Sequence, residues 1–293
     1  LNKEVSEVNL DDRYVVSSDG ARIDYDIVVI ATGVHLDYDA IPGNRDLLNT
    51  FGDYYSSIND ARKLWITLRK MRRGTYFIGI ADPVYKCPPA PHKAAFLSNN
   101  LFKKTGVRDK VKIILAVPFP HVYSSKAVSD VIEPKLHEEG IETITFFTVD
   151  NIDIKNKVVT SLEGDEVKFD VATVIPVNSG PRIKITLSDV RDEMNFIKVD
   201  KLKLNIEGYD DAYAIGDASN VPTSKSGVTA HLHAEVVSDR LQGLNTIADG
   251  RTHCPIINDG EGTFVISDYF HPPVPVKMSK FKRLQEDLFI AFY

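Results

Sequence analysis

The chain has 293 residues, of which 43% are hydrophobic and 26% charged, and its formal net charge is −6. This composition is typical of a globular protein with a sizeable core and excludes a disordered chain, and the length suits about two domains. The negative charge argues against a nucleic-acid partner, which usually requires a basic face. No apolar run approaches the ~18 residues of a membrane-spanning helix.

The chain has only two cysteines, Cys87 and Cys254, and no Cys-x-x-Cys pattern. Two cysteines are too few for a disulfide scaffold, and no metal site is expected. Taken alone, two such cysteines are most often bystanders. The first 30 residues after Leu1 have the pattern of the middle of a domain, and the chain stops at Tyr293 inside an amphipathic pattern. We therefore expect a fragment trimmed at both ends.

Alternating strand patterns come first, around a hairpin turn at Ser18–Gly20, and a buried strand and an amphipathic helix (60–74) follow. The next segments alternate between strand and helix: 75–81, 91–104, 110–117, 125–140, 142–149, two alternating strands within 156–169, and 171–177. This alternation predicts a parallel sheet with crossover helices and a meander insertion.

The remaining chain predicts a return to the first domain through a strand near 212–215 and a helix over 228–245. The expected fold is α/β, with two Rossmann-like domains of which the first is incomplete, and a short C-terminal tail. The expected boundaries are 1–74 for the remainder of the first domain, 75–180 for the second Rossmann-like domain, 181–253 for the return to the first domain, and 254–293 for the tail.

Two glycine turns follow buried strands, in "YDIVVIATG" and in "GYDDAYAIGDAS". Either one alone could be an ordinary strand and turn. Together, on both sides of the strand–helix unit, they resemble the later flavin motifs of the two-dinucleotide-domain flavoproteins. The resemblance implies FAD as cofactor, held at Thr32 and Gly33, at Gly216 and Asp217, and at the dipole of a helix that begins near Val228.

The stretch "IGIADPVYKCPPAPHKAAF" occupies the place where such proteins use glycines to bind NAD(P)H. Only Gly79 is present, and Pro88, Pro89 and Pro91 lack the amide donors that a phosphate needs. The sequence therefore predicts no nicotinamide binding at 75–95. It predicts a redox site at Cys87 instead.

Three stretches resemble the sulfide:quinone oxidoreductases and, as near relatives, the flavocytochrome c sulfide dehydrogenases: "YKCPPAPHKAAF", "NVPTSKSGVTAHLHAEVVSDRL" and "HCPIINDGEGTFVISDYF". The resemblance implies that Cys87 and Cys254 meet as a disulfide or polysulfide bridge that sulfide attacks. It implies Lys225 near the flavin or quinone and His121 as a proton-handling residue; a satisfied surface histidine is the alternative for His121. Many members have a third cysteine, which 51–63 lacks, so the chain fits the two-cysteine subset.

The tail mixes basic residues with apolar ones: Lys277, Lys280, Lys282 and Arg283 with Phe281, Leu284, Leu288, Phe289 and Phe292. This pattern is compatible with a helix docked on the core. It is also compatible with a helix that lies on an anionic membrane surface, where a quinone is found. The second interpretation predicts a peripheral membrane protein, on the cytoplasmic face of a prokaryotic membrane.

The leading functional hypothesis is a sulfide:quinone oxidoreductase whose partners are sulfide, a quinone and a membrane surface. A homo-oligomer is left open. The alternatives are a flavocytochrome c-type sulfide dehydrogenase, a type II NADH:quinone oxidoreductase and a non-catalytic flavoprotein-like scaffold. Because the pyrophosphate of FAD normally binds at a first turn that lies outside this sequence, we expect the fragment to hold FAD weakly or not at all and to be inactive.

Overall fold

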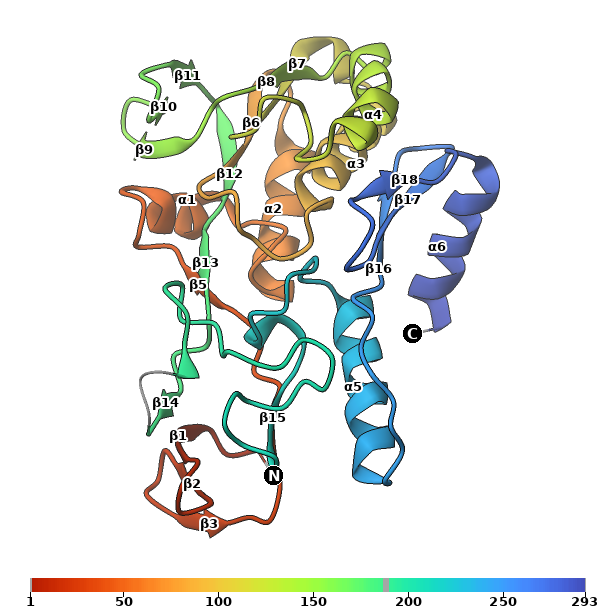
Figure 1. Ribbon diagram of the computed structural model, residues 1–293. Coiled ribbons are helices and arrows are strands. Elements are labelled where there is room, and N and C mark those ends of the chain that lie inside the picture. Colours follow the sequence, from red (N-terminus) through yellow and green to blue (C-terminus); the bar gives the residue numbers. More distant parts are fainter. Residues whose placement is uncertain (1, 187–189, 293) are drawn as a thin grey trace. The chain divides into compact units, whose positions relative to one another are not determined.

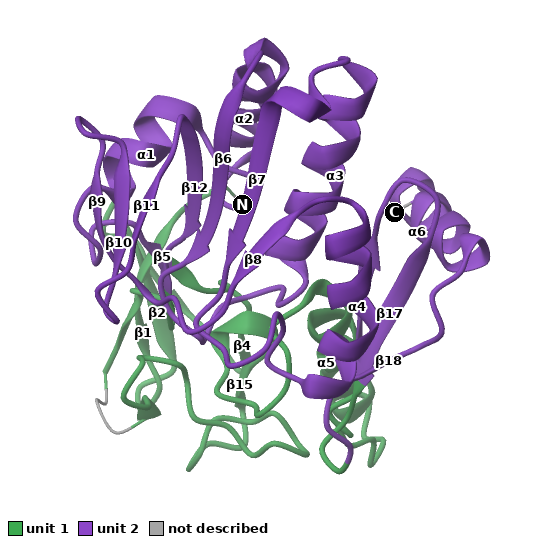
Figure 2. Cartoon of the chain, turned by 90° about the horizontal axis from the view of Figure 1, so that it is seen from above, with its two compact units in different colours: residues 1–35, 178–252, 267–270 green, residues 36–177, 253–266, 271–293 purple. Residues whose placement is uncertain are grey.

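The computed structural model describes residues 2–186 and 190–292. The chain forms two compact units, each built from several segments (Figure 2). Unit 1 consists of residues 1–35, 178–252 and 267–270, and unit 2 consists of residues 36–177, 253–266 and 271–293.

A four-stranded parallel sheet is the centre of unit 2. Its strand order is β12 (Val171–Ile175), β6 (Gly74–Ile80), β7 (Val111–Ala116) and β8 (Glu142–Ile144). Helix α3 (Ala90–Lys104) joins β6 to β7, and α4 (Lys126–Glu138) joins β7 to β8 (Figure 1). The expected α/β fold with a parallel sheet and crossover helices is confirmed.

Both faces of this sheet are buried, because successive residues of a strand point to opposite faces. Tyr76 and Ile78 of β6 belong to a core with α2 (Ile58–Lys70), α3 and α4. Phe77 belongs to a second core with Leu47 of α1 (Asn44–Phe51) and the meander that precedes β12. The uninterrupted apolar run of β6 is therefore the pattern of a strand covered on both sides.

The meander consists of β9 (Val149–Asp153), β10 (Val158–Ser161) and β11 (Glu166–Lys168), all paired antiparallel. The sequence predicted one strand over 142–149, but β8 ends at Ile144. Phe146 takes a left-handed conformation (φ +51°), and its amide donates to Phe119 O at 3.0 Å. An extended strand cannot continue through such a residue.

Unit 2 ends in a three-stranded sheet and a helix. The sheet contains β16 (Thr252–Ile257, which begins at the last residue of the adjoining unit 1 segment), β17 (Gly262–Ser267) and β18 (Val274–Pro275). Helix α6 (Lys280–Phe292) follows, and the two backbone hydrogen bonds between Ser279 and Gly262 fix its start against β17. A 3₁₀ turn, η1 (Arg108–Lys110), precedes β7.

Unit 1 is built around a sheet of order β14 (Lys184–Ile185), β1 (Val5–Asn9), β2 (Tyr14–Ser17) and β3 (Arg22–Asp24). The predicted hairpin turn is confirmed, since β2 and β3 pair antiparallel and Gly20 N donates to Ser17 O at 2.9 Å. Helix α5 (Gly227–Leu241) also belongs to this unit. In this unit β4 (Val28–Ile30) also pairs with β15 (Ala212–Ala214). Strands β5 (His35–Asp37) and β13 (Val177–Ser179), which pair with each other, each contain residues assigned to both units.

Over residues 2–186 and 190–292, none of the helices has the length and apolar character needed to cross a membrane.

Candidate flavin and cysteine sites

The two glycine turns of unit 1 lie at the same edge of one sheet. Strands β4 and β15 are parallel neighbours, with Ile30 opposite Ala214, and Ile215 N donates to Ile30 O at 3.0 Å. Because parallel strands end at a common edge, Thr32–Gly33 and Gly216–Asp217 follow this edge together. The sequence motifs, far apart along the chain, are adjacent in space.

Both glycines have a conformation that other residues rarely adopt. Gly33 has φ +71° with open space where a Cβ would be, and Gly216 has φ +60° with Ala230 Cβ 3.0 Å from that position. A side chain at either residue would strain the turn. At Gly33 the backbone is bare, which lets a flat ligand approach closely, whereas at Gly216 the missing side chain lets α5 pack closely through Ala230.

His233 of α5 supports the second turn. Gly216 N donates to His233 Nδ1 at 3.2 Å, and burial lowers the pKa of His233 to about 4, with the charge of Lys225 as a second cause. The imidazole is therefore neutral at pH 7, and its proton is on Nε2. This buried donor has no acceptor among the described residues, as expected of a group that faces a polar ligand.

Lys225 is folded over the same turn. Its Nζ donates to Asp217 O at 3.2 Å and to Ser219 O at 2.8 Å, and lies 3.7 Å from the centre of the Phe196 ring. Burial lowers the pKa of Lys225 to about 8, against the opposing charge of Asp217. A partly charged ammonium that already holds the turn is available to an anionic ring edge.

Helix α5 begins beside Lys225 and not at Val228 itself. Ser226 is its N-cap and accepts from Thr229 N at 3.2 Å, so Val228 is the second residue of the helix. The Ser-x-x-Thr cap fixes the direction of the helix N-terminus. Gly33, Gly216, His233 and this N-terminus together fit a flavin, whose polar ring edge needs donors and close backbone approach.

In unit 2, Cys87 lies in the loop between β6 and α3, at a strained position. Cys87 has φ +52°, a left-handed conformation that costs free energy for a residue with a Cβ. Its carbonyl accepts from Ala90 N at 2.8 Å, which closes the turn into α3. Two tyrosine hydroxyls hold the flanking carbonyls: Tyr55 donates to Lys86 O at 2.5 Å and Tyr85 to Pro88 O at 3.2 Å.

Cys254 is on β16 and is buried. The pKa of the Tyr123 phenol is raised mainly by burial. The negative charges of Tyr85, Cys254 and Cys87 raise it further. Two cysteines far apart in the sequence thus lie within electrostatic reach of one hydroxyl. Both side chains are thiols in this structure.

The half-buried His121 lies in the loop between β7 and α4, two residues before Tyr123. The fully buried His92 of α3 holds this loop, because its Nε2 donates to Val122 O at 2.6 Å and its ring lies 5.2 Å from that of Tyr123. The sequence indicates only a structural histidine at His92 and no role for Tyr55, Tyr85 or Tyr123. Tyr85 and His92 flank the cysteine-proline turn, but Tyr55 and Tyr123 lie far from it along the chain and have no signal in the sequence.

The first turn of α3 offers few donors to a phosphate. Pro88, Pro89 and Pro91 have no amide hydrogen, and Ala90 N already donates to Cys87 O. Gly79, the one glycine of this loop region, has a packing role, since a Cβ there would lie 2.6 Å from the Phe77 ring.

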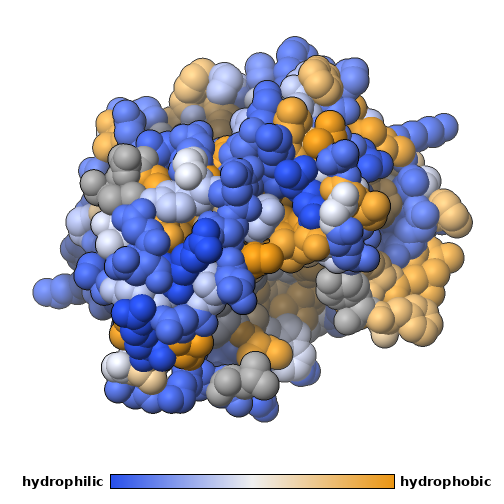
Figure 3. Space-filling view, turned by 60° about the horizontal axis from the view of Figure 1, so that its bottom comes forward, coloured by the Kyte–Doolittle hydropathy of each residue, from blue (hydrophilic) through white to orange (hydrophobic). Residues whose placement is uncertain are grey.

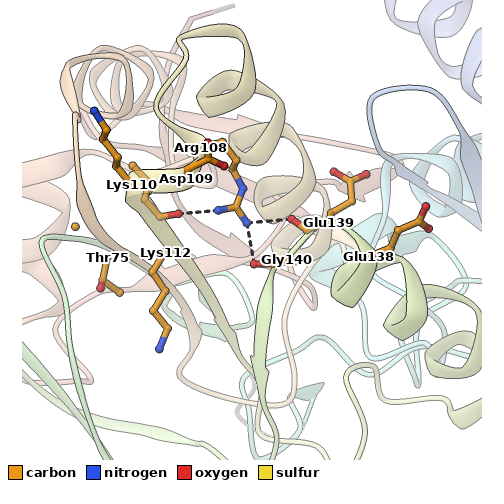
Figure 4. A pocket seen from close by; sticks show the side chains of 10 residues that line it. Thr75, Arg108, Asp109, Lys110, Lys112, Glu138, Glu139 and Gly140 are labelled. Carbon is orange, nitrogen blue, oxygen red and sulfur yellow. Dashed lines mark hydrogen bonds between the residues drawn. The ribbon is translucent and has the colours of Figure 1, made fainter.

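A cavity of about 670 Å³ lies at the opposite, amino-terminal ends of β6 and β7 (Figure 4). Arg108 crosses it, and donates to Val111 O at 2.7 Å, Glu139 O at 3.0 Å and Gly140 O at 2.7 Å. The guanidinium is used to cap the carbonyls at the end of α4, which is a structural role. Among the described residues no cluster of His, Cys, Asp and Glu could hold a metal ion.

Residues 62–176 match the family model of the central region of the flavoprotein chain of flavocytochrome c sulfide dehydrogenase. The chain is 30% identical to the mitochondrial sulfide:quinone oxidoreductase of Dictyostelium discoideum over 258 residues. This alignment covers 84% of this chain and 57% of the relative. It is 25% identical to that of Mus musculus, over 98% of this chain and 66% of the relative. The chain thus spans about three fifths of the length of these relatives.

The solved structure of sulfide:quinone oxidoreductase from the hyperthermophilic bacterium Aquifex aeolicus superimposes with a TM-score of 0.78 at 20% identity, over all of this chain and 74% of that one. The NAD-dependent persulfide reductase from A. fulgidus superimposes with a TM-score of 0.65 at 17% identity, over 89% of this chain and 48% of that one. The fold is that of FAD/NAD(P)-binding Rossmann-type proteins. In sequence the chain is similar to the sulfide:quinone oxidoreductases, and in fold it is a Rossmann-type protein like these FAD/NAD(P)-binding neighbours.

Proposed function

We propose that this protein oxidises sulfide to sulfane sulfur and passes the electrons through FAD to a membrane quinone. The observation that carries the proposal is that Cys87, at a left-handed turn, and the buried Cys254 both lie in unit 2. Supporting it are the sequence similarity to sulfide:quinone oxidoreductases and the two glycine turns at one sheet edge of unit 1.

The proposed reaction begins from the oxidised cysteine pair. Hydrosulfide attacks one sulfur, so that a persulfide bond forms, the bond between the cysteines breaks, and the second cysteine leaves as a thiolate. The persulfide and the thiolate then lose two electrons together and a bond forms between them, so that the pair closes as a trisulfide; the quinone takes up the two electrons with two protons and becomes the quinol. A further sulfide or thiol removes the central sulfur as a persulfide, and the two cysteine sulfurs rejoin as the disulfide. His121, near the loop that holds Tyr123, takes up the protons that sulfide loses.

FAD, when bound, accepts an electron pair and passes it on. We assign its binding to Thr32, Gly33, Gly216 and Asp217 at the sheet edge, with Lys225 and the α5 N-terminus near Val228 at the ring. The bare backbone of Gly33 and the buried donor of His233 support this assignment. The charge of Lys225 and the helix dipole both favour a ring that has gained electrons.

The orientation of α6 supports a membrane surface as the partner. Four apolar residues share one stripe of this helix, and all are about half exposed or more: Phe281, Leu284, Leu288 and Phe292. The charged Glu286 is buried instead, and burial raises its pKa against the opposing charge of Lys93. An amphipathic helix docked on a core has the opposite arrangement.

Exposed apolar side chains gather in patches on the face shown in Figure 3. With Lys277 and Lys280, also exposed, α6 has the composition of a helix that lies in an anionic lipid interface. We propose that α6 makes this a peripheral membrane protein and brings it to its quinone. The cytoplasmic face of a prokaryotic membrane stays a prediction, since the curated relatives are named as mitochondrial proteins.

The test is sulfide-dependent quinone reduction by the holoenzyme with Cys87→Ser and Cys254→Ser. Each variant should lose about a thousandfold or more of the turnover, because each cysteine takes part in the same covalent cycle. Circular dichroism and the fluorescence of the single tryptophan, Trp65, should be unchanged and serve as the control for folding. Full turnover in both single variants would overturn the proposal.

The family-model match favours one second candidate, a flavocytochrome c-type sulfide dehydrogenase, whose electrons go to a haem protein. The same holoenzyme separates the two functions. Reduction of a cytochrome c by sulfide in the absence of quinone would favour the dehydrogenase.

A further inference from the structure

The peptide group between Lys86 and Cys87 governs the direction in which the Cys87 side chain leaves the backbone. A peptide group is planar and rigid, so it rotates as one unit through the dihedral angles beside it, which are ψ of Lys86 and φ of Cys87. Cys87 has φ +52°, a conformation that is strained for a residue with a Cβ. If this peptide group were free to rotate, Cys87 would relax to a negative φ and its sulfur would point elsewhere.

The side chain of Tyr55 holds this peptide group. Its hydroxyl donates to the Lys86 carbonyl oxygen at 2.5 Å, across 31 positions of the chain, and Lys86 Nζ lies 4.9 Å from the centre of the Tyr55 ring. On the other side of Cys87, the next carbonyl accepts from Ala90 N at 2.8 Å. Both peptide groups that flank the cysteine are therefore fixed by hydrogen bonds, and the first of the two depends on a single phenol.

Tyr55 is fixed in turn by the carboxylate of Asp53, of which only 3% is exposed. Asp53 Oδ1 accepts from Tyr55 N at 3.0 Å and from the amide and the hydroxyl of Ser56 at 2.9 and 2.7 Å. The other oxygen accepts from the hydroxyl of Tyr38. A carboxylate is costly to bury, and these hydrogen bonds offset that cost. Asp53 thus fixes the backbone from which the Tyr55 ring extends to the cysteine turn.

We propose that Tyr55 is a positioning residue that holds Cys87 in the conformation in which it reacts, and that Asp53 acts through Tyr55. The inference rests on the proposed function, in which the Cys87 sulfur repeatedly forms and breaks bonds to other sulfurs. Bonds between sulfurs require a narrow range of separations and dihedral angles, so a rotated peptide group that redirects the sulfur slows each exchange. Loss of one neutral hydrogen bond changes the ratio of held to relaxed turns by about twofold to tenfold.

The first measurement is nuclear magnetic resonance of the reduced holoenzyme with ¹³C-labelled cysteine, since the Cα and Cβ shifts of a residue follow its φ and ψ. The signal of Cys87 is identified by its loss in Cys87→Ser. Tyr55→Phe keeps the ring and removes the hydroxyl, and it should move or split this signal; Asp53→Asn should move it by a smaller amount. The matched control is Tyr76→Phe, a buried tyrosine of the same unit whose hydroxyl lies 3.0 Å from Thr173 Oγ1, and it should leave the signal in place.

The second measurement is sulfide-dependent quinone reduction by the same proteins. Tyr55→Phe should lower kcat by about twofold to tenfold and leave KM for sulfide nearly unchanged, because only the held fraction of the turns reacts. Asp53→Asn should lower kcat in the same way. Added to Tyr55→Phe, it should cause no further loss, because its effect passes through the Tyr55 hydroxyl.

An unmoved Cys87 signal in Tyr55→Phe, with circular dichroism like that of the parent, would overturn the inference. An equal movement in Tyr76→Phe would also overturn it, since the effect would then be general packing. So would a moved signal with an unchanged kcat, because the held conformation would then be irrelevant to the reaction. Additive losses of kcat in the double variant would contradict the role of Asp53.

The two measurements also separate this inference from the proposed function. A parent holoenzyme that reduces no quinone with sulfide would contradict the proposed function. The cysteine spectrum uses neither substrate, so it still decides whether Tyr55 holds the turn.

Discussion

Cys87 combines two features that a structural cysteine does not need. Its backbone is left-handed, and Tyr55 and Tyr85 hold the carbonyls on either side of it, while His92 of the following helix holds the carbonyl of Val122. Strain of this kind persists only where the surroundings over-determine it. At the scale of single residues, the strained conformation of the cysteine turn is therefore held by the hydrogen bonds of the side chains around it.

His92 provides a test of how this site is held. Its folded pKa of about 4 lies below the usual 6.5, so the unfolded chain binds more protons between these values. The stability that comes from the neutral, buried imidazole is fully present above pH 6.5 and is lost as the pH falls towards 4. Between pH 7 and 4.5 this loss amounts to about 2–3 kcal/mol.

The measurement is urea unfolding at both pH values, followed by Trp65 of α2, in the parent and in His92→Gln. From pH 7 to 4.5, the free energy of unfolding of the parent should fall by about 2–3 kcal/mol more than the free energy of unfolding of His92→Gln. Parallel losses in the two proteins would show that His92 is already charged or exposed.

At the scale of elements, α6 is the helix whose orientation matters most. Its apolar stripe faces solvent and its buried residue is a glutamate, while Arg283 bonds to Asn258 O at 2.5 Å and to Asp287. Phe281→Ser with Leu288→Ser should weaken binding to anionic vesicles by about tenfold to a hundredfold, because each buried apolar side chain contributes about 1.5–3 kcal/mol and an interface buries only part of it.

Vesicle binding is measured by co-sedimentation with vesicles of phosphatidylcholine and phosphatidylglycerol. The matched control is Ile58→Ser, which removes a side chain that is 85% exposed from another helix of unit 2. Equal vesicle binding by the double variant and the parent would favour a docking role for α6 within the protein.

Much of the element order was predictable, for identifiable reasons. The strands of the parallel sheet are apolar runs bounded by turns, and the hairpin at Ser18–Gly20 has a glycine at φ +85°. The end of β8 was not predictable, because it depends on a left-handed Phe146 bonded to a distant loop. Patterns report periodicity, and a single residue fixed by tertiary contacts leaves no periodic signal.

The same distinction applies to the candidate site. Glycine turns and the cysteine-proline turn have local signatures, and the structure places Gly33 and Gly216 at one sheet edge. The hydrogen bond from His92 to Val122 O joins residues that are 30 positions apart, and the outward stripe of α6 depends on which face Glu286 buries. Neither can be read from spacing along the chain.

At the scale of the whole molecule, the two units carry two halves of one proposed chemistry. Unit 1 has the sheet edge with the two glycine turns, and unit 2 has the cysteine pair in the domain that resembles a dinucleotide-binding one. The proline-rich turn before α3 leaves a pyrophosphate few donors. The proposed reaction therefore takes its reducing equivalents from sulfide and not from a nicotinamide.

The most direct measurement is an anaerobic titration of the oxidised holoenzyme, followed by the visible absorbance of its flavin. Stoichiometric sulfide should bleach the flavin, an added quinone should restore the absorbance, and NADH at the same concentration should leave it unchanged. Bleaching by NADH, or an unchanged spectrum with sulfide, would contradict the account.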